Sequence, residues 1–195
     1  MNRDLMKLLE RTLRGELRKT QRRKSSAPWV VVILVISVFA ISRWREEPNA
    51  PLPNKGTALA CEISRVYDGD TVTARCENGL LKVRIYGIDA PEIGQKPWGE
   101  QSRDALRNLA PNGSSVRLQI QDTDRYGRAV AQLFAGDRDL GLEMVRQGRA
   151  VVYAQYNRFP AYKTAQSEAQ HGKKGVWVKP GAQQTPWEWR KLNPR

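Results

Sequence analysis

Residues 68–92 read DGDTVTARCENGLLKVRIYGIDAPE, and the rest of the chain can be interpreted from this stretch. It opens with the turn sequence DGD and closes with the loop sequence DAPE at residues 89–92. Between them, Leu81, Val83 and Ile85 alternate with polar side chains, as in a half-buried β-strand. Acidic residues therefore stand at the ends of predicted strands, where loops on a rigid scaffold usually carry function.

The flanking sequence continues this pattern of short strands and adds helices at helical spacing. The strands are predicted at residues 63–67, 71–76, 80–86, 116–121 and 128–134, and the helices at residues 98–109, 137–147 and 160–171. Five short strands with a helix between the third and the fourth have the element order of an oligonucleotide-binding barrel (OB-fold). We therefore predict a β-barrel plus helices: a five-stranded OB-fold barrel with about three α-helices, preceded by an N-terminal transmembrane helix.

The N-terminal segments differ from this domain in composition. Residues 1–26 are basic and amphipathic, which suits either an anionic lipid surface or a solvated helix next to a membrane. Residues 27–44 are uncharged as far as Ser42 and predict a transmembrane anchor. The excess of Lys and Arg before the anchor predicts a cytoplasmic N-terminus and an extracytoplasmic domain. The alternative is a cleaved signal peptide and a secreted protein.

Three segments follow the anchor. Residues 45–58 contain three prolines and predict an extended linker, residues 59–180 form the folded domain, and residues 181–195 form a Trp-rich tail. The aromatic side chains of the tail are expected to pack on the barrel.

The charge of the chain indicates a polyanionic partner. Lys and Arg number 33 against 20 Asp and Glu, giving a net charge of +13. The N-terminal segment and the folded domain are both basic, so a lipid bilayer as the partner of the first does not exclude nucleic acid, DNA or RNA, as the partner of the second. No obligate protein partner is predicted.

The two cysteines and the single histidine do not have the spacing of a zinc site. Cys61 and Cys76 would lie opposite each other on adjacent strands if Asp68 and Gly69 form a two-residue turn. A β-bulge would move this register by one residue. A disulfide between them is predicted for a domain in an oxidising compartment.

The polar residues at the strand ends suit the hydrolysis of a phosphodiester. Asp70 and Asp89 would face one hard cation, Ca²⁺ or Mg²⁺, if their strands are neighbours. Glu92 would hold or deprotonate a water molecule. Arg84 and Arg128 would each donate in bidentate fashion to the charged oxygens of the transition state. Each of these residues alone is common on protein surfaces, but together they predict a metal-dependent phosphodiesterase site.

The motifs DGDT, R-x-x-x-x-DAPE and D-x-Y-G-R follow one another within residues 60–178. In these motifs the chain closely resembles the staphylococcal (micrococcal) nuclease family, also called thermonuclease-like. The resemblance implies an OB-fold barrel and a Ca²⁺-dependent endonuclease that cleaves DNA and RNA. The residues that it implies are Asp70, Asp89 and the main-chain carbonyl of Ala90 for calcium, and Arg84, Glu92 and Arg128 for catalysis.

The resemblance also implies aromatic contacts with the substrate. Tyr126 would lie beside the nucleotide, and Tyr153 and Tyr156 are candidates for stacking on a base. Ala90 stands where the family prototype has Thr, a change that a backbone ligand tolerates. The loop after Glu92 is shorter than in the prototype and has lost its Lys-rich segment.

Two other functions remain as alternatives. A catalytically silent nucleic-acid-binding barrel would not need the five charged site positions, all of which are present here. A membrane scaffold with an incidental barrel would leave those positions unexplained. We therefore predict an endonuclease that is tethered to a membrane and faces away from the cytoplasm.

Overall fold

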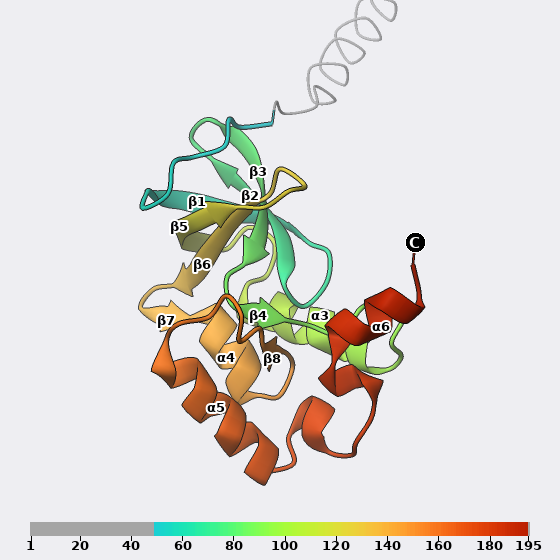
Figure 1. Cartoon of the computed structure of the whole chain (residues 1–195). Coiled ribbons are helices and arrows are strands. Elements are labelled where there is room, and N and C mark those ends of the chain that lie inside the picture. Colours follow the sequence, from blue (N-terminus) through green and yellow to red (C-terminus); the bar gives the residue numbers. More distant parts are fainter. Residues whose placement is uncertain (1–48, 195) are drawn as a thin grey trace, which may run out of the picture. The chain divides into compact units, whose positions relative to one another are not determined.

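The computed structural model describes residues 49–194 (Figure 1). The predicted anchor at residues 27–44 and the basic segment before it lie outside the described residues. Within residues 49–194, no helix is both long and apolar enough to cross a membrane.

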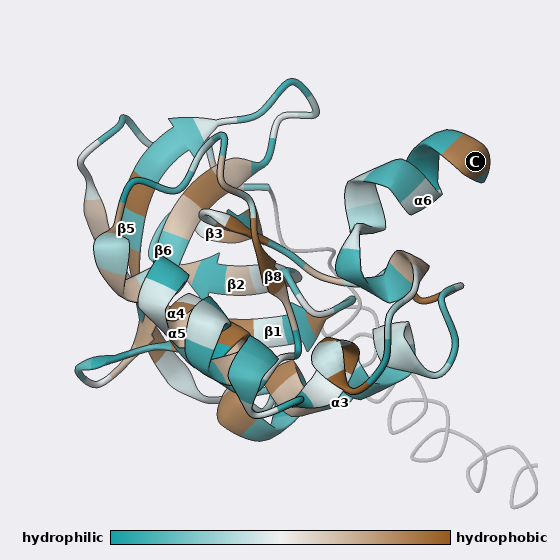
Figure 2. Cartoon of the chain, turned by 60° about the horizontal axis from the view of Figure 1, so that its bottom comes forward, coloured by the Kyte–Doolittle hydropathy of each residue, from teal (hydrophilic) through white to brown (hydrophobic). Residues whose placement is uncertain are grey.

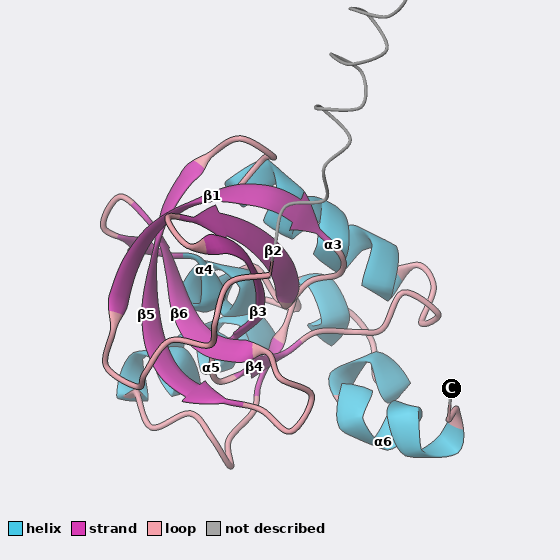
Figure 3. Ribbon diagram, turned by 90° about the horizontal axis from the view of Figure 1, so that it is seen from above, coloured by secondary structure: helices cyan, strands magenta, loops and turns pink. Residues whose placement is uncertain are grey.

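Five strands close into a barrel (Figure 3). Strands β1 (Ala58–Val66), β2 (Thr71–Cys76) and β3 (Gly79–Ile85) pair in sequence as an antiparallel meander. Strand β5 (Ser115–Thr123) pairs with β1, and β6 (Ala129–Ala135) pairs with β5. A parallel pairing between β3 and β6 closes the barrel. The predicted five-stranded barrel is confirmed.

Helices lie at one end of this barrel (Figure 1). Helix α3 (Trp98–Leu109) stands between the third and fourth barrel strands, and α4 (Leu140–Arg146) and α5 (Pro160–His171) follow the fifth. A further helix, α6 (Pro186–Leu192), was not predicted. Figure 2 shows α6 on the side of the domain away from α4 and α5.

Three strands of two residues each were also not predicted. Strand β4 (Ile88–Asp89) pairs with β8 (Val151–Val152), and β7 (Arg138–Asp139) pairs with the end of β6. The helix predicted over residues 137–147 therefore begins later than expected. Its start is fixed by the carboxylate of Asp139, which accepts hydrogen bonds from the first backbone N–H groups of α4.

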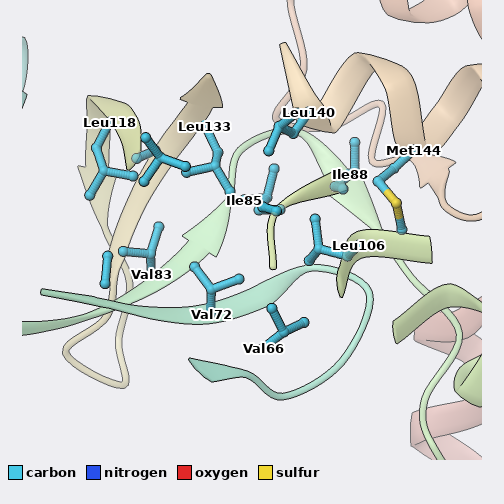
Figure 4. Close-up of a cluster of buried hydrophobic side chains, with 14 of the residues drawn as sticks. Val66, Val72, Val83, Ile85, Ile88, Leu106, Leu118, Leu133, Leu140 and Met144 are labelled. Atoms are coloured by element: carbon cyan, nitrogen blue, oxygen red, sulfur yellow. The ribbon is translucent and has the colours of Figure 1, made fainter. Parts of the chain in front are cut away.

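Apolar side chains fill the barrel and the space between the barrel and the helices (Figure 4). Val72 and Val83 of the barrel pack in the same cluster as Leu106 of α3 and Met144 of α4, and all four are fully buried. Because side chains alternate along a strand, burial of Val83 turns its neighbour Arg84 to the outer face of β3. This alternation positions the first residue of the site.

Cys61 and Cys76 face each other on β1 and β2 and form a disulfide. The turn between these strands is longer than the two residues assumed from the sequence, because the ladder ends at the pair Val66 and Val72. A β-bulge further along β1 then shifts the register back by one residue. The two deviations cancel, so the pair that a simple turn predicts is the pair that is joined.

Candidate active site

Two buried carboxylates converge on one guanidinium. Asp70 directly precedes β2 and Asp89 ends β4, and their exposed fractions are only 2% and 0%. Arg84 on β3 donates from Nη1 to Oδ1 of Asp70 and from Nη2 to Oδ1 of Asp89, each at 2.7 Å. The strand ends are thus neighbours, and both carboxylates face the same positive charge.

Asp70 is fixed by groups on both sides. Its Oδ2 accepts a hydrogen bond from the backbone N–H of Ala90 at 2.8 Å, and its Oδ1 accepts one from the hydroxyl of Thr71 at 3.0 Å. Its own backbone N–H donates to Oδ1 of Asp68 at 3.0 Å. These contacts join the DGDT turn to the DAPE loop, which explains why two motifs about 20 residues apart form one site.

Negative charge is concentrated in this cluster. Burial raises the pKa of Asp89, although hydrogen bonds from Arg190 act in the opposite direction. Burial, together with the nearby charge of Asp70, raises the pKa of Asp68 to about 7. Burial alone would lower the pKa of Arg84, but the carboxylates of Asp70 and Asp89 raise it. Three carboxylates, those of Asp68, Asp70 and Asp89, thus lie around the guanidinium of Arg84, and this excess of acidic groups can accept a further cation.

Arg190 of α6 also enters the cluster. Its Nη1 and Nη2 donate to Oδ1 and Oδ2 of Asp89 at 3.0 and 2.9 Å. Its Nη1 also donates to Oε1 of Glu92 at 3.0 Å. Sequence reasoning missed Arg190, because it lies 98 positions from Glu92 and no local pattern links them. The only signal was the group of Trp and charged residues in the tail.

Glu92 is held by a tight turn and by the start of α3. Its backbone N–H donates to Oε1 of Gln95 at 2.8 Å, and the backbone N–H of Gln95 donates back to the carbonyl oxygen of Glu92 at 2.8 Å. Gly99 packs directly on this carbonyl, since a Cβ at position 99 would lie 1.9 Å from its oxygen. These contacts fix the backbone of Glu92, and its Oε1 shares Nη1 of Arg190 with Oδ1 of Asp89.

Arg128 is positioned by the turn that precedes β6. The carboxylate of Asp124 accepts hydrogen bonds from the backbone N–H groups of Tyr126 and Arg128 at 2.9 and 3.0 Å, and from Nε of Arg128 at 2.7 Å. Gly127 takes the positive φ of 72° that the turn requires. Burial alone would raise the pKa of Asp124, but these hydrogen bonds lower it. Nη1 of Arg128 reaches the hydroxyl of Thr71 at 3.5 Å, which places Arg128 at the start of β2.

The three candidate tyrosines occupy two regions. Tyr126 is 69% exposed, and the guanidinium of Arg128 lies 5.6 Å from its ring. Tyr153 and Tyr156 contact each other edge to face, with ring centroids 4.9 Å apart. The indole of Trp187 is nearly parallel to Tyr153, at an interplanar angle of 7° and a centroid distance of 6.3 Å. One face of Tyr153 is therefore covered by the tail, as expected for aromatic side chains that pack on the domain.

The donor atoms suit a hard cation. Among the described residues, no group of three or more His, Cys, Asp and Glu side chains is arranged to hold a metal ion. Asp70 and Asp89 nevertheless meet at one positive charge, and the carbonyl of Ala90 lies on the loop that binds Asp70. Carboxylate and carbonyl oxygens, completed by water, are the ligands that Ca²⁺ uses.

Comparison with known proteins extends the similarity beyond these motifs. Residues 82–179 match the model of the family described as staphylococcal nuclease homologue. The chain is 37% identical over 129 residues to an uncharacterized endonuclease of Escherichia coli O157:H7, covering 66% of this chain and 82% of that protein. It is 37% identical over 132 residues to an uncharacterized endonuclease of Haemophilus influenzae, covering 67% and 72% of the two chains. It is 32% identical over 173 residues to a micrococcal nuclease of Shigella flexneri, covering 83% and 89%.

Proposed function

The chain belongs to the staphylococcal nuclease family, and from this premise we propose that it is a Ca²⁺-dependent endonuclease that hydrolyses phosphodiester bonds of DNA or RNA. The observation that carries the proposal is the convergence of Asp70 and Asp89 on Arg84, with Glu92 beside them. A binding domain that had lost catalysis could bury an apolar cluster here at similar or lower cost, since buried ion pairs often contribute little net stability.

The side chains of the site fit distinct roles in this reaction. Asp70, Asp89 and the carbonyl of Ala90 would hold the cation, which when bound polarises a phosphate oxygen. Glu92 would accept a proton from the attacking water. Arg84 and Arg128 come from β3 and from the turn before β6, and they would donate to the phosphate oxygens as negative charge increases. The charged residues among these are the five predicted from the sequence, and Ala90 was predicted with them as a backbone ligand.

The surface next to the site favours a polynucleotide over a small phosphodiester. Lys82 precedes Arg84 by two residues on the same face of β3, about 7 Å away along the strand. The ring of Tyr67 lies beneath the guanidinium of Arg65 and the ammonium of Lys82, at 4.8 and 5.2 Å from its centroid. Cationic and aromatic side chains that continue from a cleavage site are suited to the phosphates and bases of a single strand.

The proposal includes a location outside the cytoplasm, with the domain tethered by residues 27–44. The support is the order of the basic and apolar segments in the sequence and the disulfide between Cys61 and Cys76. Structural disulfides form and persist mainly in oxidising compartments. Cleavage of a signal peptide would instead release the same domain in secreted form.

Activity can be tested with the 195-residue chain purified in detergent. We expect it to cleave plasmid DNA, single-stranded DNA and RNA with calcium but not with a chelator. Glu92→Gln and Arg128→Ala should each lower the rate about 100-fold. Glu168→Gln, an exposed acid on α5, is the matched control and should retain full activity. Cleavage in the chelator, or cleavage that survives both site substitutions, would contradict the mechanism, and binding without cleavage would indicate the silent domain.

Topology can be tested separately from activity. A reporter enzyme that is active only in an oxidising extracytoplasmic compartment is fused after Arg195, with the fusion lacking residues 1–44 as the control. The fusion to the whole chain should be active and the truncated one inactive. An inactive fusion to the whole chain would place the domain in the cytoplasm.

A further inference from the structure

The C-terminal segment from Ala182 to Leu192, here called the C-terminal arm, lies near the candidate site. It comprises a 3₁₀ turn, η2 (Ala182–Gln184), and the helix α6. Figures 1 and 2 both show α6 on the side of the domain away from α5. The function of this arm is not explained by the reaction proposed above.

The arm is fastened to the loop that carries Glu92. Nε2 of Gln95 donates to the carbonyl oxygen of Ala182 at 2.9 Å. The indole of Trp189 packs against Gly94, since a Cβ at position 94 would lie 3.0 Å from its Cη2. Both contacts fall within three residues of Glu92, so movement of this loop and movement of the arm are coupled.

Arg190 uses the same oxygen atoms that a divalent cation would need. It engages both carboxylate oxygens of Asp89 and one of Glu92. Asp89 is fully buried with the arm in this position. A guanidinium and a metal ion that depend on the same carboxylate oxygens compete for them.

The arm also covers the aromatic surface next to the site. Trp187, three residues before Arg190, stacks on Tyr153, a candidate for contact with a substrate base. The arm therefore presents an aromatic ring at a candidate base position and a cation at the candidate metal position. The arm thus covers both candidate positions at once.

Arg84 makes similar contacts with the carboxylates but is held differently. Its side chain is 17% exposed and it belongs to a strand that is paired on both sides. The side chain of Arg190 is 34% exposed and it projects from a helix of seven residues. A short helix with limited buried surface opens at much lower free energy than a central barrel strand. Of the two arginines, Arg190 is thus the one that can move away from the carboxylates.

We propose that the C-terminal arm is an autoinhibitory latch, in which Arg190 occupies the carboxylates of Asp89 and Glu92 until a divalent cation displaces it. The latch rests on the proposed function, because the competing cation is the one assigned to Asp70 and Asp89. Binding of the cation releases α6, uncovers Tyr153 and opens the site to substrate. At low calcium the activity is therefore lower than loss of the metal alone would make it, because the closed arm also covers the site.

The first test measures the affinity for calcium ion alone, by isothermal titration calorimetry on the 195-residue chain in detergent. Arg190→Ala should bind calcium about tenfold more tightly than the wild type, because a latch closed in about ten of eleven molecules raises the apparent Kd by that factor. Lys191→Ala removes the same charge from an exposed neighbour on α6 and should bind as the wild type does. Unchanged or weaker binding by Arg190→Ala would overturn the latch.

A second measurement needs no substitution in the arm. Hydrogen exchange of the wild type should show faster exchange of the α6 amides in saturating calcium, while the amides of α5 are unchanged. Slower exchange in α6, or no change, would overturn the latch even if Arg190→Ala failed to fold.

One variant separates failure of the latch from failure of the proposed function. If Asp70→Asn abolishes calcium binding and Arg190→Ala has no effect on it, the metal site stands and only the latch is wrong. If neither the wild type nor Arg190→Ala binds calcium, no cation competes with Arg190, and both proposals are wrong.

Discussion

The role proposed for Arg128 can be tested through its partner Asp124, without changing Arg128 itself. In Asp124→Asn the side chain keeps its shape, and Oδ1 still accepts from the backbone N–H groups of Tyr126 and Arg128. The amide nitrogen that replaces Oδ2 cannot accept the hydrogen bond that Nε of Arg128 makes at 2.7 Å. The turn should therefore persist while the guanidinium loses its anchor.

The expected loss of activity follows from the free energy of this one hydrogen bond between Arg128 and Asp124. Hydrogen bonds to charged groups contribute about 1.5–3 kcal/mol. The side chains of Arg128 and Asp124 are 21% and 19% exposed, so solvent screening favours the lower end, about 1.5 kcal/mol. If Arg128 contacts the phosphate in the transition state, loss of this orientation should reduce kcat/KM about tenfold.

The assay is cleavage of a labelled single-stranded DNA in calcium, with urea unfolding measured in parallel. Asp122→Asn is the matched control, since Asp122 is an exposed acid two residues earlier whose Oδ1 accepts from the backbone N–H of Thr123. It should leave kcat/KM unchanged. An Asp124→Asn protein that is less stable but equally active would refute the reasoning, as would an equal loss of activity in the control.

Three further predictions concern stability and pH. Replacing Cys61 and Cys76 together by Ser should lower the free energy of unfolding by about 3 kcal/mol, because the disulfide closes a loop with a sequence separation of 15; urea unfolding that is unchanged would contradict this. Gly99→Ala should lower both stability, by about 1–3 kcal/mol, and nuclease activity, because the new Cβ displaces the carbonyl of Glu92; full activity would show that this contact does not position Glu92. The lowered pKa of Asp124 means that its charge stabilises the fold above the ordinary value of 3.8 and that this contribution is lost as pH falls through the lowered value. The stability difference between wild type and Asp124→Asn should therefore be constant from pH 5 to 7 and vanish in stronger acid, as urea unfolding across pH would measure; a constant difference at every pH would rule out a charge effect.

The barrel could be predicted because its strands carry a strong local pattern. On β3, Leu81, Val83 and Ile85 are buried while Lys82 points outward, as their alternation in the sequence indicates. The strands β4 and β8 lack such a pattern, since two residues each give no periodicity. They form because the chain after α4 returns to the DAPE loop, a tertiary contact that no local sequence specifies.

The residues of the site likewise include some that the sequence predicts and one that it does not. Asp70 and Arg84 could be brought together from the sequence, because β2 and β3 pair within the barrel, and Asp89 follows Arg84 by only five residues. Arg190 could not, because its place depends on how a short helix packs rather than on strand pairing. Between Cys61 and Cys76, the longer turn and the β-bulge shift the strand register in opposite directions. A register derived from one assumed turn therefore predicted the right pair although the turn itself is different.

The position of the Arg84 guanidinium between Asp70 and Asp89 also matters for the folding of the chain. Two acidic groups sealed inside a protein with no counter-charge would repel each other and oppose collapse of the chain around them. Here a built-in cation neutralises them at 2.7 Å on each side. In small metalloproteins that lack such a partner, ion uptake supplies the free energy of folding. In this protein the neutralising charge belongs to the chain itself, so burial of the two acids needs no bound ion.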